Sequence, residues 1–121
     1  MPATRGRLED IKTCIGYIRE TLAGKSLADL ENEWSTRFTF ERCLEVISEA
    51  SRHIPDGLKA SHGATIPWQH VAALGNVLRH AYHRSNVPTL WSIYEDDLDS
   101  LEAAVDAMLA ALPSPPAPLR S

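Results

Sequence analysis

Residues 8–22 read LEDIKTCIGYIRETL, and the spacing of their apolar side chains decides the fold class. Gly24 follows two residues later and can end a helix in a left-handed cap. The apolar residues recur at steps of three and four, which places them on one face of an amphipathic helix: Leu8, Ile11, Ile15, Ile18 and Leu22.

Two further helices are predicted in the first half of the chain. Ser26 and Asp29, three residues apart, are typical of a capping box that opens a short helix through Trp34. Thr36 or Thr39 can cap a third helix. Its apolar face keeps the helical period at Phe40, Leu44, Ile47, Ser51 and Ile54.

The sequence of the second half of the chain predicts two longer helices. A Pro-Asp-Gly turn leads into a loop-like stretch over residues 56–66. Pro67 fits the first turn of a fourth helix that ends near His83. Pro88 restarts the chain as a fifth helix, whose apolar seam continues to Leu112. Because no stretch alternates β-branched residues, we expect an all-α fold, an antiparallel helical bundle of about five helices.

Length and composition indicate one domain. The chain has 121 residues and is 44% hydrophobic and 23% charged, which is ordinary for a protein that buries its own core. We expect a helical domain over residues 1–112 and a disordered, proline-rich tail over residues 113–121. We also expect no signal peptide and no membrane span, because charged residues precede or interrupt the apolar runs. Cys14 and Cys43 fit reduced, buried thiols and a cytoplasmic location.

Charge is unevenly distributed. The net charge of −4 argues against bulk adhesion to nucleic acid, although residues 37–84 carry six basic against four acidic residues and all five histidines. This stretch fits an ordinary mixed surface or a local basic patch. A charged face of the third helix fits either a solvated surface or the lining of a cleft: Arg42, Glu45, Glu49 and Arg52.

The densest polar stretch, GNVLRHAYHR, spans residues 75–84. His80 and His83 share a helix face, but no cysteine or acidic third ligand stands nearby, so we expect neither a metal nor another cofactor. His80 fits a general acid or base, or a structural hydrogen-bonding residue. Tyr82 fits a core or interface aromatic side chain. The pattern alone leaves the function open.

Several stretches between Arg7 and Leu112 resemble the HepT family of the HEPN helical superfamily. They are residues 7–11, 42–50, 66–68, 76–82, 91–93 and 97–98. The resemblance implies a dimeric toxin paired with a small nucleotidyltransferase antitoxin of the MNT type. It also implies a metal-independent endoribonuclease that acts on RNA through the motif R-x-x-x-x-H-x-Y.

The motif carries over with one departure. His80 is the motif histidine, and Asn76 is the polar residue that often follows the motif arginine, but Gly75 stands where the arginine belongs. Arg79 or Arg84 could supply the missing charge. In a two-fold dimer, Arg79 of one copy could approach His80 of the other.

The resemblance also implies regulation at Tyr82, to which the nucleotidyltransferase attaches AMP. His83 and Arg84 are candidates to hold the incoming phosphate, since both can donate to phosphate oxygens. Two functions therefore stay open. One is a homodimeric RNase toxin using His80, Asn76 and Arg79. The alternative is a HepT-like binding protein, with nuclease activity weak or lost at Gly75, that engages a nucleotidyltransferase, a nucleotide or RNA.

Overall fold

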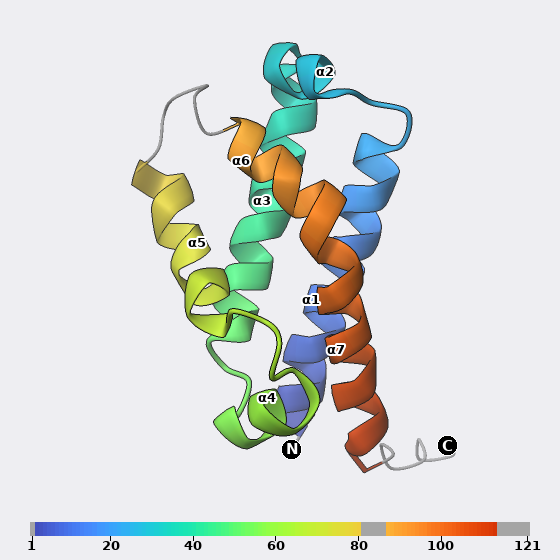
Figure 1. Cartoon of the computed structure of the whole chain (residues 1–121), viewed down its shortest axis with the longest axis vertical. Coiled ribbons are helices and arrows are strands. Elements are labelled where there is room, and N and C mark those ends of the chain that lie inside the picture. Colours follow the sequence, from blue (N-terminus) through green and yellow to red (C-terminus); the bar gives the residue numbers. More distant parts are fainter. Residues whose placement is uncertain (1, 81–86, 114–121) are drawn as a thin grey trace, which may run out of the picture.

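The computed structural model describes residues 2–80 and 87–113, and every regular element within them is helical (Figure 1). The all-α prediction is therefore confirmed for the described part of the chain. A π-helical turn, η2 (Ile93–Asp97), joins the last two α-helices. The α-helices are α1 (Pro2–Leu22), α2 (Leu27–Asn32), α3 (Trp34–Ser51), α4 (Asp56–His62), α5 (Trp68–His80), α6 (Val87–Ser92) and α7 (Leu98–Ala111).

The core forms where the apolar face of α1 meets α3 and α7 (Figure 1). All five residues predicted for the apolar face of α1 have no exposed surface. Phe40 of α3 and Met108 of α7 are likewise fully buried. Burying a side chain of this size stabilises the fold by about 1.5–3 kcal/mol. The helical period of residues 8–22 thus fixes which face of α1 the rest of the molecule covers.

The chain between α1 and α2 turns as the sequence predicts. Gly24 has a φ of +73°, the left-handed conformation in which a side chain is strained. At the start of α2, the Asp29 amide donates to Ser26 Oγ at 3.1 Å, and the Ser26 amide donates to Asp29 Oδ2 at 2.9 Å. The predicted capping box is confirmed.

The predicted start of the third helix is wrong. The short second helix ends at Asn32 instead of running through Trp34 as predicted; Trp34 begins α3, before either threonine proposed as its cap. Thr36 lies inside the helix, and its hydroxyl donates to Glu33 Oε1 at 2.8 Å. Lys25 Nζ also donates to that oxygen at 2.7 Å, and this bond, followed by the one from Thr36, lowers the pKa of Glu33. The chain around Glu33 is therefore ordered by side-chain hydrogen bonds that the helical sequence pattern does not predict.

The predicted loop over residues 56–66 is also wrong, because its first part forms α4. The Pro55 carbonyl accepts hydrogen bonds from the amides of Leu58 and Lys59, at 3.1 and 3.2 Å, which starts a helical turn. Asp56 lies in the first turn, where a negative charge is favourable. Leu58 packs against the core, and α4 contacts α7. This tertiary contact is what the Pro-Asp-Gly pattern does not reveal.

The segment predicted as a single fifth helix forms two α-helices with a π turn between them. A π turn takes up an additional residue per turn, and η2 separates α6 from α7. Leu90 and Leu98, on either side of it, are both buried, while the intervening residues 95–97 are exposed. The predicted end of the fourth helix near His83 lies outside the described residues, and so does the predicted tail over residues 113–121 apart from Pro113. Among the described helices, none has the length and apolar character to cross a membrane.

Candidate functional site

Helix α5 carries the polar motif, and both its start and its middle are fixed by hydrogen bonds. At the start, Trp68 Nε1 donates to the Gly63 carbonyl at 2.8 Å. The Pro67 carbonyl accepts from the amides of His70 and Val71 at 2.9 and 3.1 Å, so the first turn forms directly after the proline. These bonds set the position from which α5 extends along α3 (Figure 1).

A buried serine joins the middle of α5 to α3. Ser48 is 2% exposed, and its Oγ donates to the Ala72 carbonyl at 2.9 Å. The same oxygen accepts a hydrogen bond from the Gly75 amide at 2.9 Å. A Cβ atom at position 75 would lie 3.2 Å from Ser48 Oγ, closer than side chains normally pack. The glycine that stands in place of the motif arginine is therefore in close contact with α3.

The motif residues that the structure describes lie on the exposed side of α5. Asn76 and Arg79 are both exposed, and His80 is the last residue of α5 as described. At about 100° per residue, Asn76, Arg79 and His80 fall within one sector of the helix. The His80 side chain lies outside the described part of the structure, as do Tyr82, His83 and Arg84.

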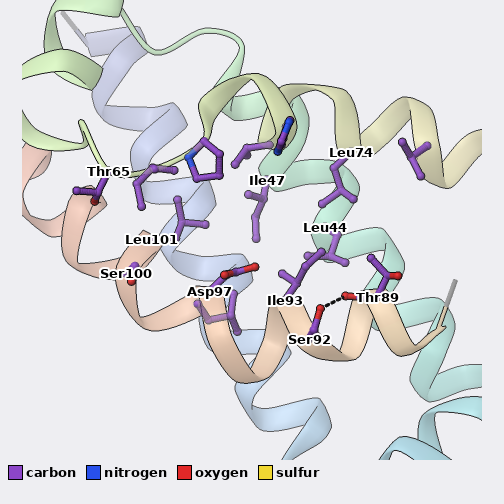
Figure 2. A pocket seen from close by; sticks show the side chains of 16 residues that line it. Leu44, Ile47, Thr65, Leu74, Thr89, Ser92, Ile93, Asp97, Ser100 and Leu101 are labelled. Atoms are coloured by element: carbon purple, nitrogen blue, oxygen red, sulfur yellow. Dashed lines mark hydrogen bonds between the residues drawn. The ribbon is translucent and has the colours of Figure 1, made fainter.

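The other side of α5 lines an apolar groove of about 530 Å³ (Figure 2). Leu74 enters it from α5, Ile93 and Leu101 enter it from the opposite wall, and Leu44 and Ile47 of α3 lie behind them. We call this space the α5–α7 groove.

Ten of the sixteen residues that line the α5–α7 groove are apolar, and of the six polar ones only His70 and Asp97 are titratable. Asn76 follows Leu74 by two residues and so points about 160° away from it around the helix. The α5–α7 groove and the motif face are therefore separate surfaces of one helix.

The charged face of α3 is partly exposed and also lines a cleft. Arg42 Nη1 lies 3.8 Å from Glu45 Oε2, and Glu49 Oε1 lies 3.2 Å from His53 Nε2. Three of the four predicted stripe residues, Arg42, Glu45 and Glu49, line a space of about 140 Å³ together with residues of α1. Opposite charges are mixed there, so the cleft does not select one sign of ligand.

The two cysteines are free and buried, as predicted. Burial, followed by the neighbouring Cys43, raises the pKa of the Cys14 thiol to about 11. Burial also raises the pKa of Cys43. Because the thiolate is the reactive form, neither thiol suits a catalytic role. Within residues 2–80 and 87–113, no group of three metal-ligating side chains is placed to hold an ion.

The sequence profile of the family described as Ribonuclease HepT-like matches residues 11–108. This span includes most of α1 and α7, all of α3 and the whole described part of the motif. The chain belongs to the HepT-like family. The family is HEPN-related, and the all-helical architecture of the described residues is consistent with that relationship.

Curated relatives support the HepT-like assignment over most of their length. A protein of Thermococcus cleftensis, named a probable ribonuclease HepT, is 35% identical over 101 residues, which cover 84% of this chain and 91% of the relative. A candidate RNase of Caldanaerobacter subterraneus is 28% identical over 109 residues, 90% of this chain and 96% of the relative. A candidate RNase of Methanocaldococcus jannaschii is 31% identical over 75 residues, 62% of this chain and 68% of the relative. No solved structure matches the chain significantly.

Two features of this HepT-like site are not evident from the sequence. Ser48 reads as one more position of the apolar face of α3, although a small polar residue within such a face is a signal for a helix contact. The α5–α7 groove has no local signal, because it depends on the distance between helices that are far apart in sequence. Both features bear on α5, the helix that carries the motif.

Proposed function

We propose that the protein is the toxin of a toxin–antitoxin pair and acts as a metal-independent endoribonuclease. The observation that carries this proposal is the placement of the HepT-like motif on an exposed face of α5, where Asn76 and Arg79 stand beside the position of His80. An exposed face can admit a polymer such as RNA, whereas a closed pocket cannot. The names of the relatives point to the same class of substrate.

The proposed reaction is a transesterification within the RNA chain. The 2′-oxygen attacks the neighbouring phosphorus, and the bond from phosphorus to the 5′-oxygen breaks. His80 takes the proton from the 2′-hydroxyl as a base or supplies one to the departing 5′-oxygen as an acid, since imidazole titrates near neutrality. Asn76 and Arg79 donate hydrogen bonds to the phosphate as its negative charge grows. The products are a 2′,3′-cyclic phosphate and a free 5′-hydroxyl.

We propose that the active form is a homodimer. The motif face of α5 supplies only one wall of a substrate cleft, because its polar side chains are exposed. A second copy related by a two-fold axis would supply the same residues on the opposite wall. Two copies of His80 could then act as base and acid in one reaction.

The proposed antitoxin is an MNT-type nucleotidyltransferase that silences the RNase at Tyr82. The phenolic oxygen would attack the α-phosphorus of ATP, and pyrophosphate would leave. The attached AMP would add negative charge to a motif that has to bind an RNA phosphate, so it would repel the substrate. His83 and Arg84 are proposed to hold the incoming phosphate.

Cleavage of a short RNA in EDTA tests the proposed activity. Wild-type protein should cut RNA with the metal chelated, and His80→Ala should lose that cleavage while keeping its helical circular dichroism. Loss of wild-type activity in EDTA, or full activity of His80→Ala, would contradict the mechanism.

The alternative is a HepT-like binding protein with weak or no nuclease activity. Gly75 in place of the motif arginine favours it, and so does the α5–α7 groove, whose size and apolar lining suit a bound partner. That reading predicts binding of a nucleotidyltransferase, a nucleotide or RNA by a wild-type protein that does not cut RNA.

A further inference from the structure

The glycine at position 75 is part of a packed contact and not an empty place on the helix. Gly75 is buried, and its amide donates to Ser48 Oγ. A Cβ atom there would lie 3.2 Å from Ser48 Oγ and 3.5 Å from Ser48 Cβ. An arginine at this position would have to begin against α3. Position 75 can therefore carry a side chain only if the side chain of Ser48 moves.

The guanidinium of Arg79 lies over this glycine. Arg79 Nη1 is 3.5 Å from the point at which a Cβ atom of residue 75 would stand. Residues 75 and 79 are one turn apart, and helical side chains lean towards the N-terminus, so a side chain at 79 naturally reaches back over 75. The positive charge of Arg79 thus lies next to the atom from which the motif arginine would grow.

The guanidinium has donors available for a phosphate. Within residues 2–80 and 87–113, no carboxylate forms an ion pair with Arg79, and residues 81–86 contain no Asp or Glu in the sequence. Arginine presents its N–H groups in a rigid fork that matches two phosphate oxygens. Asn76 follows Gly75 directly and is exposed on the same side of α5.

We propose that the motif cation has moved by one helical turn within the same chain, so that Arg79 contacts the scissile RNA phosphate and Gly75 is the space that lets its guanidinium lie there. This inference rests on the proposed RNase activity and refines it. Gly75 is a complement to Arg79 under this proposal and does not mark a lost activity. Ser48 is a positioning residue, because its hydrogen bonds fix where α5 lies along α3.

Moving the cation back tests the proposal. Arg79→Ala should lower kcat/KM for RNA cleavage by about 100-fold or more, the usual effect of removing one charged donor from a transition state. Arg79→Lys should retain part of the activity. A triple variant with Gly75→Arg, Arg79→Ala and Ser48→Ala should have a kcat/KM at least tenfold higher than the variant that lacks Gly75→Arg. Ser48→Ala provides room for the new side chain, since the nearest remaining neighbour is then the Cβ atom of residue 48 at 3.5 Å.

Matched controls keep folding and chemistry apart. The reference for the transplanted arginine is Ser48→Ala with Arg79→Ala, which differs from it only at position 75. Equal circular dichroism and equal thermal midpoints establish that both fold. Wild-type cleavage by Arg79→Ala would overturn the proposal, and so would a transplanted arginine that recovers nothing in a folded protein.

Binding of a 2′-deoxy oligonucleotide gives a readout that does not depend on cleavage. Loss of one phosphate contact in Arg79→Ala should reduce the slope of log K against log salt by about 0.7 for a single strand. An unchanged slope would overturn the role of Arg79. If wild-type protein binds but never cleaves RNA, the proposed function fails, and the salt slope still decides whether Arg79 holds the phosphate.

Discussion

Replacing Ser48 by alanine measures the contact that holds the motif helix in place. The substitution removes one oxygen that makes two hydrogen bonds of 2.9 Å, to the Ala72 carbonyl and from the Gly75 amide. Each buried hydrogen bond contributes about 0.5–1.5 kcal/mol, so the pair contributes about 1–3 kcal/mol. The higher helix propensity of alanine returns about 0.5 kcal/mol. We expect the free energy of unfolding to fall by about 0.5–2.5 kcal/mol.

Urea unfolding followed by circular dichroism at one fixed protein concentration is the assay. For a slope of about 1.5 kcal/mol per molar urea, the middle of the expected range lowers the midpoint by about 1 M. Ser35→Ala is the matched control, because it makes the same change at an exposed position of α3 and should stay within about 0.5 kcal/mol of wild type. If Ser48→Ala costs no more than Ser35→Ala, the serine does not hold α5 against α3.

Four further outcomes follow from the structure and the proposed function. Gly63→Ala should destabilise the fold by about 1–3 kcal/mol and lower the thermal midpoint, because the new Cβ atom would lie 2.8 Å from the Trp68 ring. An unchanged midpoint would contradict this. Burial raises the pKa of Cys14 from 9.0 to about 11, so between these pH values the native state keeps a proton that the unfolded state loses. The free energy of unfolding should therefore fall as pH rises through that window and fall less in Cys14→Ala; equal slopes would refute this. Light scattering at micromolar concentration should give twice the chain mass of 13.4 kDa, and a monomer would count against the proposed dimer. Co-expression with an MNT-type nucleotidyltransferase should add AMP to Tyr82, detected by peptide mass spectrometry; a label that persists in Tyr82→Phe, or that maps to Tyr17, would show the wrong acceptor.

Local patterns predict the parts of the fold that local interactions determine. The period of α1 and the capping box at Ser26 each involve residues within a few turns, and both are confirmed. Helix α4 is missed because it depends on Leu58 packing against the core. The π turn is missed because a uniform helical period assumes the same hydrogen-bond spacing along the whole segment, and the apolar spacing from Leu90 to Leu98 fits that period.

The sequence likewise predicts some features of the candidate site and not others. The sequence identifies Asn76, Arg79 and His80 as motif positions and identifies Gly75 as a departure from the motif. It does not reveal that Gly75 contacts Ser48, which is 27 positions away, or that the Arg79 guanidinium lies over the glycine. A residue that looks like a loss in the one-dimensional motif is a packing contact in three dimensions.

The most direct test of the central claim is cleavage in EDTA of an RNA and of the same strand with a single 2′-deoxy nucleotide at the cut site. Wild-type protein should cut the RNA to a 2′,3′-cyclic phosphate and spare the 2′-deoxy position, and His80→Ala should cut neither strand. Cleavage at the 2′-deoxy position, or cleavage that requires a metal ion, would contradict this claim.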